Sequence, residues 1–316
     1  MKHTNKVAAT DSATDSIPIP AVEGVSHRFV ELPGLRMHVA EAGAGEPLLL
    51  LHGALQNWWA WRKVIPGLAR HYRVLAPDLR GQGWTDVPRS GYTGEQMVGD
   101  LVALLDALDL DSVLLVSTDM GAIPGYALCY EHPDRVRAHV AITVPPLAVK
   151  LKPGHLKAFA PLWHQEVGAL PGIAPALFGR GRQPLARHML TGFSAAAQPM
   201  QADEQELYLA LLRQPERARA TSEMFRHLVL PAVAKIASGH YRRRRSTTPT
   251  LIIGSTEDRS FPPSMLEDMI DTARPFMSGI ELAIVDHAAH YVAQENPAPV
   301  VDHVLRFFHE FAPASR

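Results

Sequence analysis

Asp119 stands where an apolar, strand-like run gives way to a helix-like segment. The run Val113–Val116 leads into Ser117-Thr118-Asp119-Met120-Gly121, and an apolar segment from Ile123 to Tyr130 follows. Small residues two positions before and two positions after Asp119 are typical of a strained turn that lifts one side chain above a parallel sheet. A carboxylate in that place works best by in-line displacement at an sp3 carbon that carries a leaving group. We therefore expect Asp119 to act as a nucleophile.

Two other interpretations of this turn compete with that one. Ser117 would need small residues at the positions of Leu115 and Asp119, so Ser117 does not fit as the nucleophile. Asp119 could instead only cap the helix that follows it, as aspartate often does. The choice depends on whether an acid and a base follow later in the chain.

Such groups do follow, each after a strand-like run. Glu257 and Asp258 come after the run Thr250–Gly254, and His287 and His290 come after an apolar run that ends at Val285. A histidine that is oriented by a carboxylate can activate a water molecule as a general base. The order nucleophile, acid, histidine is also the order found in α/β hydrolases. The residue types alone do not decide between the two acids or between the two histidines.

Regular alternation of short apolar runs and longer helical patterns indicates which elements position these groups. Strands separated by helices predict a mostly parallel, doubly wound sheet, and sites in such sheets form outside the carboxyl ends of the strands. The expected strands are His27–Glu31, Met37–Ala42, Pro47–Leu51, Tyr72–Pro77, Ser112–Val116, Ala138–Thr143, Thr250–Gly254 and Glu281–Val285. The expected helices include Gly94–Leu108, Ile123–Glu131 and Pro299–Phe311.

The alternation breaks in the middle of the chain, which predicts three parts. Residues 146–247 look helical throughout and are expected to form a cap over the sheet, while 23–145 and 248–316 form the core domain. Residues 1–22 are polar at their start and lack the hydrophobic core of a signal peptide. We expect them to be a disordered leader on a cytoplasmic protein, with an ordered arm as the alternative.

Composition excludes several classes of function. The chain has 316 residues, of which 47% are hydrophobic, so it can bury a substantial core. A net charge of -1 gives no support for nucleic acid or an anionic membrane as a partner. The single cysteine, Cys129, excludes an internal disulfide. No metal cluster, phosphate loop or dinucleotide fingerprint is evident, so we expect no metal and no cofactor. The expected partner is a small apolar substrate, and the chain is expected to be a monomer or a homodimer.

Further motifs carry a resemblance to a known family. The stretch from His52 to Arg62 resembles the oxyanion loop, and the stretch from Pro77 to Asp86 a second signature, of α/β hydrolases of the epoxide hydrolase and haloalkane dehalogenase branch. The resemblance implies an α/β-hydrolase fold with a mostly parallel eight-stranded sheet, helices on both faces and an inserted helical cap. It implies Asp258 as the acid, with Glu257 as the runner-up, and His290 rather than His287 as the base.

The resemblance also implies a mechanism. Asp119 would form an alkyl ester, and His290 would activate the water that hydrolyses it. The backbone N–H groups of Ala54 and Met120 would stabilise the oxyanion. Trp58, Trp59 and Trp163 are candidates for an apolar pocket, although tryptophans also fill cores.

The leaving group needs a donor from the cap, and here the chain departs from the family. His164 stands at the place of the first of two expected tyrosines, and Phe225, which cannot donate a hydrogen bond, stands at the place of the second. The donor is then expected to be His164, Trp163 through its indole, Tyr208 or water, and a core role for His164 is the alternative.

Departures from the dehalogenase patterns decide the order of the functional hypotheses. Met120 stands where haloalkane dehalogenases usually have a tryptophan, and Ala54 where they often have an asparagine. Ile123 and Pro124 stand where fluoroacetate dehalogenases carry arginines, and Leu55 replaces a family proline. We expect hydrolysis of an epoxide to a diol. The alternatives are a dehalogenase of the haloalkane or haloacid type, then an ester or lactone hydrolase, or a ligand-binding protein on the same fold.

Overall fold

An eight-stranded sheet forms the centre of the computed structural model, which describes residues 17–197 and 199–311. The strand order is β1-β2-β4-β3-β5-β6-β7-β8. The strands are β1 (Ser26–Leu32), β2 (Leu35–Ala42), β3 (Pro47–Leu51), β4 (Arg73–Pro77), β5 (Val113–Thr118), β6 (Val136–Ile142), β7 (Thr250–Ser255) and β8 (Ile280–Val285). β2 pairs with β1 and β4 antiparallel, and the pairs from β4 through β8 are parallel. The predicted mostly parallel sheet is confirmed, and the strand boundaries differ from the predicted ones by two residues or fewer.

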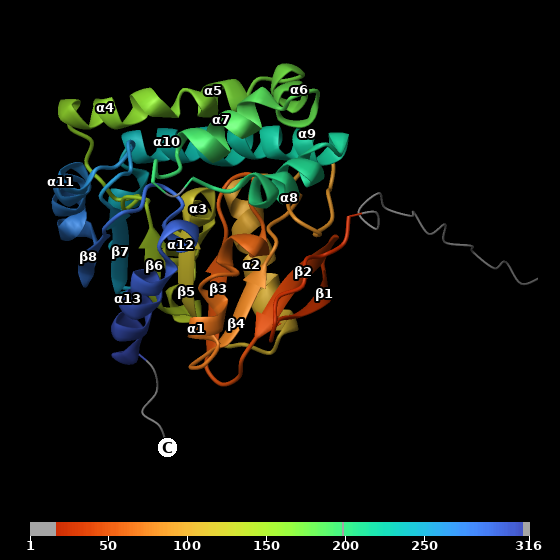
Figure 1. Cartoon of the computed structure of the whole chain (residues 1–316). Helices are drawn as coiled ribbons and strands as arrows, with labels where there is room; N and C mark the ends of the chain where they lie inside the picture. Colours follow the sequence, from red (N-terminus) through yellow and green to blue (C-terminus); the bar gives the residue numbers. More distant parts are fainter. Residues whose placement is uncertain (1–16, 198, 312–316) are drawn as a thin grey trace, which may run out of the picture.

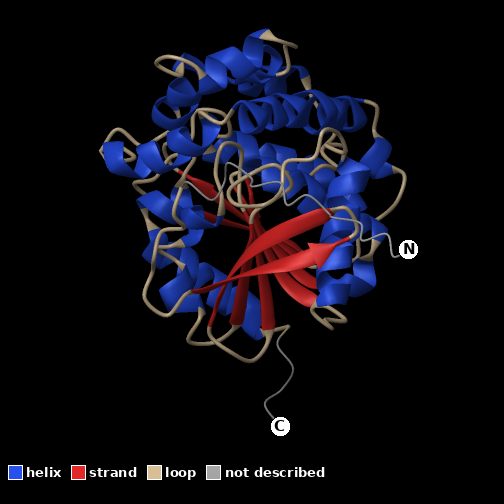
Figure 2. Cartoon of the chain, turned by 90° about the vertical axis from the view of Figure 1, so that its right-hand side faces the viewer, coloured by secondary structure: helices blue, strands red, loops and turns tan. Residues whose placement is uncertain are grey.

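Helices cover both faces of the sheet, as Figures 1 and 2 show. Side chains of α2 (Gly94–Ala107) pack in one buried cluster, while those of α1 (Ile65–Leu68) and α13 (Pro297–His309) pack in another. Strands β3 and β5 are apolar and almost wholly buried, as expected for strands with both faces covered. The remaining helices of the core part are α3 (Ala122–Glu131), α11 (Pro263–Ala273) and α12 (Val292–Glu295).

The chain between β6 and β7 forms a separate layer of helices. Its elements are α4 (Leu156–Phe159), α5 (His164–Gly168), α6 (Ile173–Gly179), α7 (Pro184–Gly192), α8 (Ala202–Leu212), α9 (Pro215–Met224), a π-helical turn (Phe225–Val229) and α10 (Leu230–Ala237). Figure 1 shows this layer above the carboxyl ends of the central strands. These helices lie within residues 146–247, for which the sequence predicts a cap, and we refer to them as the cap.

Residues 17–22 differ from the expectation for the start of the chain. The side chains of Ile17, Ile19 and Val22 pack against the core cluster, and the Ile17 carbonyl accepts a hydrogen bond from the Trp84 indole at 2.8 Å. Prediction of a disordered leader is therefore wrong for residues 17–22, because three apolar side chains among these six residues find a place in the core. The rest of the predicted leader, residues 1–16, lies outside the described residues.

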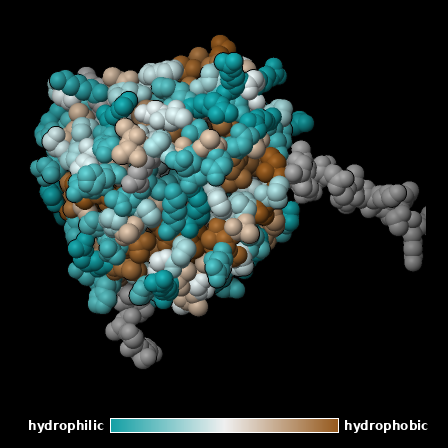
Figure 3. Space-filling view, viewed as in Figure 1, coloured by the Kyte–Doolittle hydropathy of each residue, from teal (hydrophilic) through white to brown (hydrophobic). Residues whose placement is uncertain are grey.

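The surface is mainly hydrophilic in the view of Figure 3, with hydrophobic areas scattered over it and one near α6 at the top. Within the described part of the chain, no helix is both long and apolar enough to cross a membrane.

Candidate active site

Asp119 occupies a tight turn between β5 and α3. Its φ of 48° lies in the left-handed region, which is costly for a residue with a side chain. The turn passes so close to the neighbouring loop that a Cβ on Gly121 would lie 2.3 Å from the His52 carbonyl oxygen. Parallel pairing of Leu51 with Ser117 places the carboxyl ends of β3 and β5 side by side. This explains both the small residue at position 121 and the approach of the His52 loop to Asp119.

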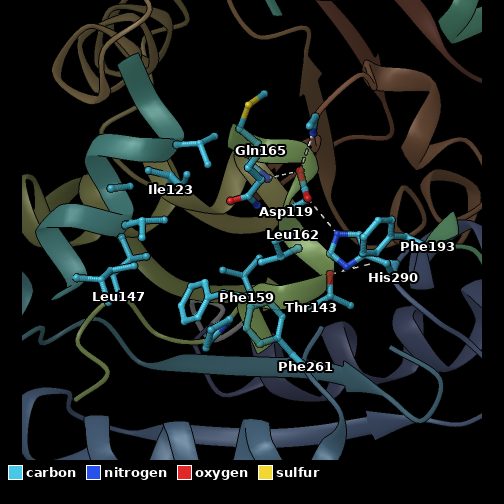
Figure 4. Close-up of a pocket in the computed structure, with 18 of the residues that line it drawn as sticks. Asp119, Ile123, Thr143, Leu147, Phe159, Leu162, Gln165, Phe193, Phe261 and His290 are labelled. Atoms are coloured by element: carbon cyan, nitrogen blue, oxygen red, sulfur yellow. Dashed lines mark hydrogen bonds and ion pairs between the residues drawn. The ribbon is translucent and has the colours of Figure 1, made fainter. Parts of the chain in front are cut away.

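The two carboxylate oxygens of Asp119 have different partners (Figure 4). Oδ1 accepts hydrogen bonds from the backbone N–H groups of Ala54, at 2.7 Å, and Met120. Oδ2 lies 3.0 Å from Nε2 of His290. Burial opposes the charge, but the hydrogen bond and charge of His290 and the two amides lower the pKa of Asp119 to about 2. Asp119 is therefore ionised at neutral pH, and Oδ2 is the oxygen that the two backbone amides leave free.

His290 connects Asp119 to the acid that follows β7. Its Nδ1 lies 3.0 Å from Oδ2 of Asp258. Burial disfavours the imidazolium, but the Asp258 carboxylate and the bond to Asp119 raise the pKa of His290 to about 10. Asp258 is buried, whereas Glu257 and His287, the alternative acid and base, are both exposed. The structure thus brings together Asp119, His290 and Asp258.

A buried histidine holds the loop that supplies the Ala54 amide. His52 accepts a hydrogen bond from the Leu79 N–H at 3.0 Å and its Nδ1 donates to the Gly53 carbonyl at 2.9 Å. Leu55, in the place of the family proline, has a φ of 63°, which a proline ring cannot adopt. The Ala54 amide nevertheless reaches Asp119. The loop therefore presents this amide in a conformation that a proline at position 55 would not allow.

Asp78 and Arg80 support the surrounding loops. Asp78 accepts hydrogen bonds from the backbone N–H of Trp58, at 2.7 Å, and of Trp84, at 2.9 Å. Arg80 forms a buried, two-bond ion pair with Asp100. Both side chains are thus occupied by structural partners away from Asp119.

Asp119 and His290 open into a cavity of about 130 Å³ that lies between the sheet and the cap. Most of its lining is apolar, with Ile123, Leu147, Phe159, Phe193 and Phe261 among the residues that Figure 4 labels. Its polar lining residues are Asp119, Thr143, His164, Gln165, His290 and Tyr291. Among the described residues, no lysine, arginine, asparagine or tryptophan lines it.

Two of the predicted cap residues line this cavity. His164 is buried, and burial lowers its pKa to about 4, so its imidazole is neutral at pH 7 and can donate one N–H. Phe225 lines the same cavity and stacks on Phe178 with ring centroids 5.8 Å apart. Phe225 thus contributes an apolar ring, and no hydrogen-bond donor, to the cavity wall.

Four residues proposed from the sequence for the pocket lie outside the cavity lining. Trp163 is 49% exposed and its ring packs on His188, with centroids 4.9 Å apart. Tyr208 is buried in the cap, where its hydroxyl donates to Gln294 at 3.2 Å. Trp58 is buried in the core with its ring against His27, and the neighbouring Trp59 also lies outside the cavity lining.

Sequence reasoning missed three polar residues of the cavity. Gln165 and Tyr291 directly follow His164 and His290 in the chain, and Thr143 directly follows the end of β6. The rule that sites form beyond the carboxyl ends of strands could have found Thr143. Nothing in the residue types marks Gln165, whose amide can donate. The Tyr291 hydroxyl donates to the Met189 carbonyl at 3.0 Å.

Glu295 ties the cap to the loop that carries His290. Its two oxygens accept hydrogen bonds from the backbone N–H groups of Ala195 in the cap, at 2.9 Å, and Ala289, at 2.6 Å. The His290 N–H also donates to the Phe193 carbonyl at 3.1 Å. Burial raises the pKa of Glu295 despite these bonds. The Glu295 side chain thus links Ala195 of the cap segment to Ala289, the residue before His290.

No group of three or more histidine, cysteine, aspartate or glutamate residues in the described ranges is arranged to hold a metal ion.

Comparison with known proteins agrees with this architecture. The family model of the alpha/beta hydrolase fold matches residues 46–297. Epoxide hydrolase A of Mycobacterium tuberculosis is 30% identical over 89% of this chain and 97% of its own length. The soluble epoxide hydrolase of Corynebacterium sp. is 27% identical over 90% of this chain and 97% of its own length. The solved structure of the epoxide hydrolase CorEH without ligand has a TM-score of 0.76 and 26% identity, and the match covers 91% of this chain and 100% of that chain. The chain is a hydrolase that belongs to the alpha/beta hydrolase fold family, in its epoxide hydrolase branch.

Proposed function

We propose that this hydrolase converts an uncharged, apolar epoxide to a diol through an ester on Asp119. The observation that supports the proposal most strongly is that the two oxygens of the Asp119 carboxylate have different partners. Two backbone amides bind Oδ1, while Oδ2 lies beside His290 at the floor of an apolar cavity. An alkyl ester formed at Oδ2 leaves its carbonyl oxygen in the place where an oxyanion needs donors.

In the first step, Oδ2 of Asp119 forms a bond to an epoxide carbon, and the carbon–oxygen bond of the ring breaks. The ring oxygen leaves with the electron pair and accepts a hydrogen bond from the neutral imidazole of His164 or the amide of Gln165, both of which line the cavity. His290 enters this step as the imidazolium and supplies the proton that neutralises the alkoxide, directly or through water. The products are an ester of Asp119 whose alkyl group carries the new hydroxyl, and a neutral His290.

In the second step, neutral His290 acts as the base. Ester formation removes the Asp119 charge, which is one cause of the raised pKa of His290, so this pKa falls and the neutral form of the histidine is favoured. It takes a proton from water, and the oxygen of that water attacks Cγ of Asp119. The amides of Ala54 and Met120 stabilise the charge on Oδ1. Collapse of the intermediate breaks the bond from Cγ to the ester oxygen, and the diol leaves with the proton that His290 took from the water. The new carboxyl group then passes its proton to His290, which restores both the carboxylate and the imidazolium.

The cavity lining favours an epoxide over a halide or a haloacid. Within the described lining, tryptophan and asparagine donors for a halide are absent, as are arginine and lysine for a substrate carboxylate. His164 and Gln165 offer neutral donors, which suit an oxygen that gains charge during the reaction. The relatives named as epoxide hydrolases support the same choice.

Trapping the ester tests this proposal. In a His290→Gln variant the second step loses its base, so reaction with styrene oxide should add the mass of one epoxide to the intact protein, localised to the peptide with Asp119. An Asp119→Asn variant should show no adduct. Release of bromide from 1-bromobutane by the wild type, without reaction of styrene oxide, would instead identify a dehalogenase.

A further inference from the structure

A second cavity lies on the outside of the cap, between α6 and α9. Its volume is about 460 Å³, and it shares no lining residue with the catalytic cavity. Its floor is formed by small residues where the two helices cross. Gly179 is needed there, because a Cβ would lie 2.6 Å from the Leu212 carbonyl oxygen and 2.9 Å from Cβ of Ala218. We call this cavity the α6–α9 groove.

Positive charge is concentrated around the groove, although the whole chain carries a net charge of only -1. Four arginines and one carboxylate line it, namely Arg180, Arg213, Arg219, Arg226 and Glu223. Glu223 pairs with Arg226 at 3.1 Å, and Arg213 pairs with Glu206 outside the groove. Two of the four guanidinium groups therefore have a carboxylate partner.

The other two arginines keep an uncompensated charge. Arg219 contacts uncharged groups: it donates to the backbone carbonyls of Pro88 and Arg89, each at 2.9 Å, and its guanidinium carbon lies 5.9 Å from the centroid of the Tyr92 ring. The exposed Arg180 side chain makes no hydrogen bond or ion pair with any other described residue. A guanidinium group with free donors matches the geometry of phosphate and carboxylate oxygens.

A buried hydroxyl in the groove is also without a partner. Ser222 is 1% exposed and lines the groove, yet its Oγ has no hydrogen-bond partner among the described residues. Buried hydroxyls are normally satisfied, and an unsatisfied one costs about 1–3 kcal/mol. Because Oγ has almost no accessible surface in this conformation, a ligand acceptor would satisfy it only after the Ser222 side chain rotates toward the groove.

Apolar surface lies at one end of the groove. Pro171 and Gly172 line that end, and the adjacent Leu170 and Ile173 are 42% and 57% exposed. Figure 3 shows hydrophobic surface in this region, near α6. Large exposed side chains that flank a cavity are typical of a binding surface.

We propose that the α6–α9 groove binds an amphiphilic anion, a phosphate or carboxylate group attached to an apolar body. Arg180 and Arg219 supply the positive charge, Ser222 donates a hydrogen bond, and Leu170 and Ile173 contact the apolar part. The groove is independent of the hydrolytic reaction, because none of its residues lies in the catalytic cavity.

Isothermal titration calorimetry of the whole protein with octyl phosphate and with inorganic phosphate, at matched ionic strength, tests this site. We expect octyl phosphate to bind more tightly than inorganic phosphate, and Arg180→Ala to weaken both by about tenfold. Ser222→Ala should weaken both by a smaller factor. Arg274→Ala, which removes another exposed arginine far along the chain, is the matched control and should change neither.

The outcomes separate the possibilities. Equal weakening by Arg180→Ala and Arg274→Ala would mean that only bulk charge matters, and absence of binding of both probes up to about 10 mM would exclude the site. Octyl phosphate bound in the catalytic cavity instead would be insensitive to Arg180→Ala. Sedimentation with phosphatidate vesicles, if it is sensitive to Arg180→Ala, supports the same site with a lipid as the source of the anion, whereas binding of octyl phosphate alone supports a soluble one.

Discussion

His290 contacts one oxygen of Asp119, and the backbone holds the other. The distance from Nε2 of His290 to Oδ2 of Asp119 is 3.0 Å, while Oδ1 accepts from the amides of Ala54 and Met120. A carboxylate bound in this way cannot rotate without losing two hydrogen bonds. In the proposed mechanism, the oxygen that attacks and the oxygen that carries charge in the second step are therefore distinguished before substrate binds.

This ion pair predicts how stability depends on pH. The folded-state pKa of His290 is raised to about 10 from 6.5, so its contribution is fully present below pH 6.5 and is lost as the pH rises toward 10. Chemical denaturation of the wild type and of His290→Gln should show the larger difference in free energy of unfolding at pH 6 and a smaller one at pH 10. A difference that grows with pH would contradict the assignment of an imidazolium.

His164 is predicted to contribute to ring opening. His164→Phe removes the N–H donor but keeps an aromatic ring in the buried site, so the rate of ester formation should fall by about 10²-fold, the usual cost of one such donor. Rapid-quench measurement of ester formation checks this. The neighbouring Trp163 is exposed, and Trp163→Phe should leave the rate within about twofold, as expected for a surface change. If the rate of ester formation falls by the same factor in both variants, the loss is due to a less stable cap and not to the missing N–H donor of His164.

The sequence was sufficient for the fold, and together with the family resemblance it led to Asp119, Asp258 and His290, for two reasons. Apolar periodicity marks buried strands directly, and the order of Asp119, Asp258 and His290 follows the order of the strands that carry them. Each of these side chains lies just beyond a strand end, where the sheet itself brings them together.

The sequence did not allow us to predict which side chains of the cap face the cavity. Consecutive residues of a helix point about 100° apart, so Trp163 and His164 face different surroundings although they are neighbours. Which of them faces the cavity depends on how the helix is rotated, and that rotation depends on packing between helices. The same applies to Tyr208, whose hydroxyl is taken by Gln294, far along the chain.

Gly53 is predicted to be essential for the position of the nucleophile. A Cβ at this residue would lie 2.7 Å from Cβ of Asp119, so Gly53→Ala must displace Asp119 or the Ala54 amide. We expect a loss of turnover of at least about 10²-fold, since a displacement of about 1 Å costs that much. Gly99→Ala, in the exposed interior of α2 with nothing within 4 Å of the added Cβ, should instead stabilise the protein by about 1 kcal/mol without changing turnover. Full turnover by Gly53→Ala would contradict the described loop geometry.

Glu295 is predicted to hold the cap segment and the histidine loop together. Glu295→Gln keeps the shape of the side chain, but its NH2 group is a donor and cannot accept, so the N–H of Ala195 or of Ala289 loses its acceptor. Hydrogen exchange should speed up at the amide of at least one of these two residues, and hydrolysis of the ester should slow more than its formation. The exposed Glu267→Gln is the control. Unchanged exchange at both amides would show that Glu295 does not fasten them.

The central claim is that Asp119 itself forms the bond to substrate carbon, and a single turnover in water enriched in heavy oxygen tests it most directly. With enzyme in excess over styrene oxide, the diol should contain no heavy oxygen from the water, and the peptide that contains Asp119 should gain one heavy oxygen atom. A diol that carries the heavy oxygen, with an unlabelled Asp119 peptide, would mean that water attacks the epoxide directly and would contradict the covalent mechanism.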